Sequence, residues 1–142
     1  MCSSDLLFPE PEPEWVEVDA SAVRVENCRQ FGGPWLALEL IKTLGLDAFL
    51  RETIPSGREE VPWSVMALVL VIARLCDPSS ELSIAENFYR KTALSDLLGV
   101  PEETVYDNRL YRALDKLLPH KADLQVFLKE KLGELFELEY DL

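Results

Sequence analysis

The chain has 142 residues, of which 48% are hydrophobic, and carries a net charge of −12. This length is enough to bury the core of one domain, and this hydrophobic content excludes a chain that is disordered throughout. The acidic balance argues against a protein that coats nucleic acid without regard to sequence. Three cysteines without a CxxC pair are typical of free thiols, which predicts a cytoplasmic protein.

The N-terminal region divides into an acidic tail and a predicted β-hairpin. Residues 1–14 end in alternating proline and glutamate, which predicts an extended, disordered tail. Residues 15–27 contain two runs in which apolar and polar residues alternate, which predicts two short strands joined as a hairpin. A lone hairpin is marginally stable, so this one is expected to pack on the rest of the domain.

The stretch at residues 61–76 organises the rest of the chain. It reads VPWSVMALVLVIARLC and carries no charge from Val61 through Ala73. A helix that is apolar on every side is enclosed either in a domain or in a membrane. A bilayer span needs about 20 apolar residues, and Arg74 and Asp77 end this run sooner. The sequence therefore predicts a mainly α-helical bundle over residues 15–136, built around this buried helix.

A helix-turn-helix-like segment is predicted at about residues 94–118. Its short first helix is stopped by Gly99, and a longer helix follows that begins between Glu102 and Asp107. Such a unit places its second helix in the DNA major groove. Glutamates at the start of the longer helix would repel phosphate, and helix pairs of this kind also occur in helical bundles that bind no DNA.

Three cations of the longer helix are the candidate DNA-binding residues. Arg109, Arg112 and Lys116 share nearly the opposite side of a helical wheel from the leucines of this helix. Cations on an outer helical face can bind phosphates. No pattern indicates a catalytic or metal-binding residue: His120 is the only histidine, and no glycine-rich phosphate loop occurs. No cofactor is therefore expected for this chain.

Three segments carry a resemblance to a known family. They are QFGGPWLALEL at residues 30–40, RLCDPSSEL at residues 74–82 and YDNRLYRALD at residues 106–115. In combination they resemble the N-terminal region of bacterial DDE-type insertion-sequence transposases, over about residues 15–142. The resemblance implies an enzyme that cuts and joins DNA ends with an RNase H-like domain, which holds three carboxylates and two Mg²⁺ ions.

The resemblance stops short of the catalytic residues. In the family, the first catalytic aspartate lies in a stretch resembling YDxTSTYFEG, on a strand that follows the matched region. Residues 137–142 look like the lead-in to that strand, so Asp141 is placed before the catalytic aspartate. The chain is therefore expected to be a truncated transposase that is inactive alone, and Mg²⁺ is expected only in the missing catalytic domain.

Two functions remain open from the sequence. The first is the DNA-binding and assembly portion of a transposase, whose partners would be transposon-end DNA and a second copy of the chain in a homodimer. The second is an acidic helical protein-interaction or dimerisation module that does not touch DNA, which the net charge of −12 favours. An enzyme acting alone is a weaker third hypothesis. Neither a membrane nor a small-molecule substrate is expected as a partner.

Overall fold

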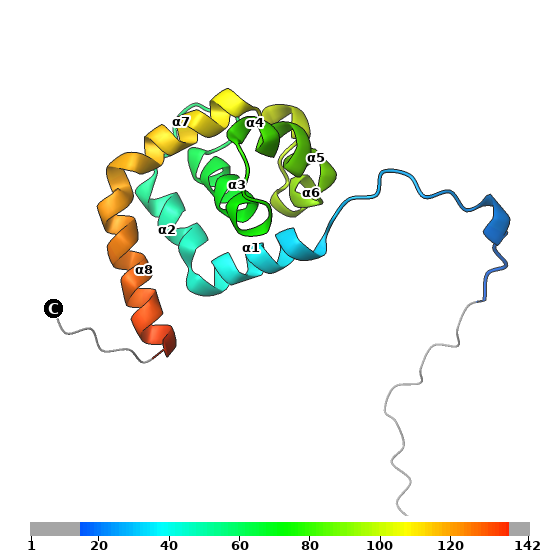
Figure 1. Ribbon diagram of the computed structural model, residues 1–142, viewed down its shortest axis with the longest axis horizontal. Helices are drawn as coiled ribbons and strands as arrows, with labels where there is room; N and C mark the ends of the chain where they lie inside the picture. Colours follow the sequence, from blue (N-terminus) through cyan, green and yellow to red (C-terminus); the bar gives the residue numbers. More distant parts are fainter. Residues whose placement is uncertain (1–14, 137–142) are drawn as a thin grey trace, which may run out of the picture.

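The computed structural model describes residues 15–136. Helices form the body of the molecule, and α3 lies at its centre (Figure 1). The α-helices are α1 Gly32–Leu44, α2 Leu46–Thr53, α3 Trp63–Cys76, α4 Glu81–Ser83, α5 Tyr89–Lys91, α6 Leu94–Leu98, α7 Asp107–Leu117 and α8 Lys121–Phe136. A π-helical turn, Ile84–Phe88, joins α4 to α5, and 3₁₀ turns lie at Ala20–Ala22, Glu102–Thr104 and Leu118–His120. The prediction of a mainly α-helical bundle is confirmed.

The enclosure of α3 is confirmed as well. Helices α1, α2 and α7 pack around it (Figure 1). Met66, Val69 and Ile72 are fully buried, so apolar residues on different sides of α3 all meet other helices. Pro62 precedes the first helical residue, where its missing N–H leaves no hydrogen bond unmade.

Glycines end two of the helices. Gly45 follows α1 with φ 73°, and its N–H donates to the carbonyls of Ile41 and Lys42. Gly99 follows α6 with φ 65°. Both conformations are left-handed, which glycine adopts without a steric penalty. These glycines let the chain reverse between short helices and so place α2 and α7 against α3.

The predicted hairpin at residues 15–27 is wrong. Within this segment the described chain forms no strand ladder; it is extended on both sides of the turn Ala20–Ala22, where Asp19 accepts a hydrogen bond from the Ser21 N–H at 2.9 Å. The apolar side chains of the segment are exposed, and Trp15 is 90% exposed. No helix within residues 15–136 covers them, and an uncovered two-stranded hairpin does not offset the entropy of ordering its backbone. The predictions for residues 1–14 and 137–142 lie outside the described residues.

The predicted helix-turn-helix-like segment has the expected helices in a different arrangement. A helix-turn-helix joins its helices by a turn of about 3–4 residues, whereas residues 99–106 separate α6 from α7. Helix α7 packs chiefly on α3, while α6 packs on α1 and α5. Both helices therefore belong to the bundle, and the later of the two predicted starts, Asp107, is the one observed.

Tyr89 fixes the connection between α6 and α7. Its side chain is fully buried, and its hydroxyl donates to the carbonyl of Val100 at 2.9 Å. Burial raises the pKa of Tyr89, with smaller contributions from the charges of Glu102 and Asp96. The phenol therefore stays protonated in the folded chain and holds residues 99–101 against α5.

We expect Tyr89→Phe to lower the free energy of unfolding by about 1–3 kcal/mol, because the buried Val100 carbonyl loses its donor. The pKa shift also gives a pH signature. The unfolded phenol ionises near pH 10, whereas the folded one resists ionisation, so stability falls as the pH rises above this value. Urea unfolding at pH 7 to 11 should show this extra fall in the wild type and a smaller one in the variant. Equal falls would contradict the assignment to Tyr89.

Candidate functional site

The outer side of α7 is the candidate site that the sequence indicates. Helix α7 begins at Asp107, directly after the extended residue Tyr106, and an acidic residue favours a first helical turn. Leu110 and Ala113 are fully buried, and α7 packs chiefly on α3. This packing decides which side chains of α7 face solvent.

Arg109 does not lie on the outer face. Its side chain is only 12% exposed, and Nη1 donates to the carbonyl of Thr104 at 2.7 Å. Nη2 lies 3.5 Å from Glu60 Oε2, and the guanidinium sits 5.1 Å from the centroid of the Tyr106 ring. The outer-face placement is therefore wrong for Arg109, which instead braces the 3₁₀ turn before α7 against the loop that precedes α3.

Arg112 and Lys116 are exposed, as the helical wheel predicts. They lie four residues apart, so their side chains occupy one face of α7 on successive turns. The site that the structure supports is therefore a pair of exposed cations rather than three.

Two carboxylates lie close to cations of α7. Glu60 pairs with Arg109, as described above. Glu59 accepts a hydrogen bond from the Gly57 N–H at 2.8 Å, which lowers the pKa of Glu59, and the charge of Lys116 lowers it further. Both acids come from the loop between α2 and α3. An anionic ligand at Lys116 would therefore meet the carboxylate of Glu59.

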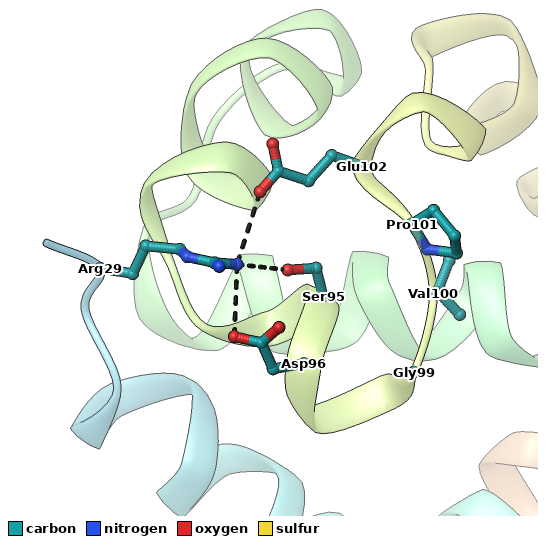
Figure 2. Close-up of a pocket in the computed structure, with 7 residues that line it drawn as sticks. All are labelled: Arg29, Ser95, Asp96, Gly99, Val100, Pro101 and Glu102. Carbon is teal, nitrogen blue, oxygen red and sulfur yellow. Dashed lines mark hydrogen bonds and ion pairs between the residues drawn. The ribbon is translucent and has the colours of Figure 1, made fainter. Parts of the chain in front are cut away.

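A second cluster lies where the chain enters α1, and Figure 2 shows it. Arg29 Nη1 donates to Ser95 Oγ at 2.7 Å and lies 3.3 Å from Asp96 Oδ2 and 3.5 Å from Glu102 Oε1. These side chains line an open cleft of about 520 Å³, whose floor continues over residues 99–101. One guanidinium faces two carboxylates, so the cleft is net negative and does not favour a phosphate ligand.

Backbone hydrogen bonds support the Arg29 cluster. The Gln30 N–H donates to the Lys91 carbonyl at 2.9 Å, and the Ala93 N–H donates to the Gln30 carbonyl at 2.8 Å, which makes an isolated parallel bridge to Thr92. Together with the Arg29 contacts, they tie the start of α1 to the junction of α5 and α6. Sequence analysis missed this cluster because nothing local marks Arg29 as the partner of residues far along the chain.

The three segments that resemble transposases meet around α3. Residues 30–40 lie largely in α1, residues 74–82 connect α3 to α4, and residues 106–115 lie largely in α7. Arg74 Nη2 donates to Glu81 Oε1 at 2.6 Å, and the charge of Glu81 raises the pKa of Tyr111. Arg74, Glu81 and Tyr111 come from α3, α4 and α7, so this cluster joins three packed helices.

The remaining described residues were compared with the requirements of a metal site and of a membrane span. Within residues 15–136, no group of three or more His, Cys, Asp or Glu side chains is placed to hold a metal ion. His120 Nδ1 lies 3.9 Å from Asp123 Oδ2 at the start of α8. None of the described helices has the length and apolar character needed to cross a membrane.

Comparison of the chain with protein-family models, with curated proteins and with solved structures gives no match. The resemblance to transposases therefore stays a prediction that rests on the three segments themselves.

Proposed function

We propose that the chain is the N-terminal DNA-binding and assembly portion of an insertion-sequence transposase, without catalytic carboxylates of its own. The observation that carries this proposal is the pair Arg112 and Lys116, exposed on successive turns of α7. Cations on one face of a helix can contact phosphates of a DNA backbone and so orient a protein on the duplex. The ligand would be transposon-end DNA, and the reaction of the parent enzyme would be DNA transposition.

The packing of α7 supports this role. Phosphate contacts orient a protein only if the helix that carries them is held rigidly, and α7 is anchored on α3 through the buried residues Leu110 and Ala113. Arg109 contributes indirectly, because it fixes the turn from which α7 starts. The resemblance assigns Mg²⁺ to a separate catalytic domain, so DNA binding by this chain is expected to need no divalent metal.

A specific observation favours a second function, an acidic protein-interaction or dimerisation module that does not touch DNA. Arg109 is engaged within the fold, where it pairs with Glu60, and Glu59 lies close enough to Lys116 for the charge of Lys116 to lower the pKa of Glu59. With a net charge of −12 over the chain, long-range electrostatics would slow the approach of DNA.

We expect the double variant Arg112→Glu/Lys116→Glu to abolish DNA binding without unfolding the chain, because both side chains are exposed. The measurement is a mobility shift on transposon-end duplexes at about 0.05 and 0.2 M salt, with EDTA present. Replacement of the same residues by alanine should flatten the dependence of log K on log salt by about one unit for each phosphate that the protein no longer neutralises.

The matched control is Lys42→Glu/Arg51→Glu, which changes the net charge equally on α1 and α2, where both side chains are exposed. It should bind nearly as the wild type does. Equal losses in the two double variants would assign binding to net charge rather than to α7. A wild-type chain without salt-sensitive DNA affinity would reject the DNA-binding function and leave the interaction module.

A further inference from the structure

Helices α7 and α8 and the turn between them carry a stripe of leucines, all but one of which are exposed. The two helices lie along the periphery and meet at the turn Leu118–His120 (Figure 1). We call this set the leucine stripe; its members are Leu114, Leu118, Leu124, Leu128 and Leu132. All except the partly buried Leu124 are exposed, and Leu118 is 68% exposed.

The stripe is continuous across the bend between the helices. Leu118 begins the 3₁₀ turn after α7 and follows Leu114 by four residues, and the other three members follow at four-residue spacing on α8. Leu114, Leu118 and Leu124 line a common apolar cleft of about 250 Å³, together with Leu117, Asp115 and Lys121.

Helix α8 is attached to the body through Phe127 and through one member of the stripe, Leu124. Phe127 stacks on Phe49 of α2 with the ring centroids 4.5 Å apart, and Leu124 also packs on the core. Leu128 and Leu132 lie beyond this contact and are 41% and 43% exposed. Contiguous exposed apolar surface of this kind marks an interaction site.

Charges beside the stripe differ in sign between the two helices. On α7, Asp107 precedes Leu114 by two turns and Asp115 precedes Leu118 by one turn. On α8, Lys121 precedes Leu124 by one turn and Lys131 follows Leu128 by one turn. Lys131 is partly buried, pairs with Glu134 at 2.8 Å and lines a pocket with Phe127 beside α2, so Lys121 is the lysine of these two that lies beside the exposed leucines.

We infer that the leucine stripe binds the same stripe of a second copy, with α7 of each copy against α8 of the other. In a two-fold interface the same patch meets itself, so it must be self-complementary. Asp115 on α7 and Lys121 on α8, which both line the apolar cleft, satisfy this condition in both halves of the interface at once. The acidic segment 15–26 fits less well, because its carboxylates would meet Asp107 and Asp115.

This inference names the partner and the interface for the assembly part of the proposed function. It rests on that part and not on DNA binding. A monomeric chain that still shifts DNA would overturn the inference and leave the DNA-binding proposal intact. A dimer that shifts no DNA would support the inference and reject that proposal.

The test uses the full chain in sedimentation equilibrium at about 0.15 M salt. The wild type should be a dimer, whereas Asp115→Lys and Lys121→Glu should each weaken dimerisation by about tenfold or more, because like charges then face each other across the interface. Mixing the two variants should restore a dimer, since each changed edge then meets an edge of opposite charge. Both variants should fold, because each change is favourable for the helix dipole. Asp115→Lys places a cation in the second half of α7, and Lys121→Glu places an anion at the start of α8.

Leu118→Glu should also give a folded monomer, because this leucine is already exposed in the single chain. Leu36→Glu on α1 is the matched control, since Leu36 is 65% exposed and lies outside the stripe, and it should leave the dimer intact. The inference would be overturned by a wild type that stays monomeric at about 100 µM, or by mixed charge variants that remain monomeric. It would also be overturned if Leu118→Glu left the dimer intact while Leu36→Glu, or the double variant Val18→Ser/Val25→Ser, broke it.

Discussion

Replacing Leu70 by alanine should lower the free energy of unfolding by about 2–5 kcal/mol. Leu70 is 4% exposed in the helix that the other helices surround, so the truncation removes apolar packing and leaves a cavity that the packed neighbours cannot fill. Urea unfolding of the full chain measures the change, which should appear as a lower midpoint with an unchanged slope.

Leu75→Ala is the matched control on the same helix. Leu75 is 56% exposed, so the same chemical truncation should change the free energy of unfolding by no more than about 0.5 kcal/mol. Similar losses in the two variants would contradict an enclosed α3. The two variants make the same exchange of leucine for alanine on the same helix, so the difference between them tests the enclosure of α3 and not its helix propensity or length.

The sequence predicted the position of α3 well because a helix this apolar, and too short to span a membrane, has to be enclosed by other elements of the domain. A helix with Met66, Val69 and Ile72 on different sides must be covered on each of them, and α1, α2 and α7 do this. Helix ends were predictable where the reason is local, as at Gly45 and Gly99 with their left-handed backbone. These features depend on residues within a few positions of each other.

The predictions that failed depend on partners far along the chain. Alternation at residues 15–27 specifies two faces of a strand but not whether another element covers one of them. Among the described elements none does. The Arg29 cluster joins residues that are remote in sequence. Periodicity carries no information about such contacts.

Helix α7 shows the same limit at the candidate site. Its wheel separates leucines from cations, yet the observed core of α7 is Leu110 with Ala113, while Leu114 is 38% exposed. A small alanine lets α7 approach α3 closely, and this rotates the helix relative to the leucine side. Rotation moves Arg109 toward the protein and leaves Arg112 and Lys116 in solvent, so the wheel was right for two of the three cations.

Replacing Arg109 by alanine should therefore affect stability more than DNA affinity, with a loss of about 1.5–3 kcal/mol in the free energy of unfolding. The Thr104 carbonyl would lose a charged donor at 2.7 Å, and the Tyr106 ring would lose the guanidinium. The Glu60 pair adds little, because Glu60 is 69% exposed. Arg109→Lys should recover only part of the loss, since an ammonium group cannot reproduce the planar guanidinium geometry.

Arg112→Ala provides the comparison for this prediction, because Arg112 is exposed on the same helix and the truncation should change stability by no more than about 0.5 kcal/mol. Urea unfolding and the mobility shift, measured on both variants, should give opposite orders: Arg109→Ala the less stable, and Arg112→Ala the weaker in DNA binding. If Arg109→Ala is as stable as the wild type and loses DNA affinity as Arg112→Ala does, Arg109 acts on the outer face after all. In that case the contact with Thr104 does not hold the start of α7.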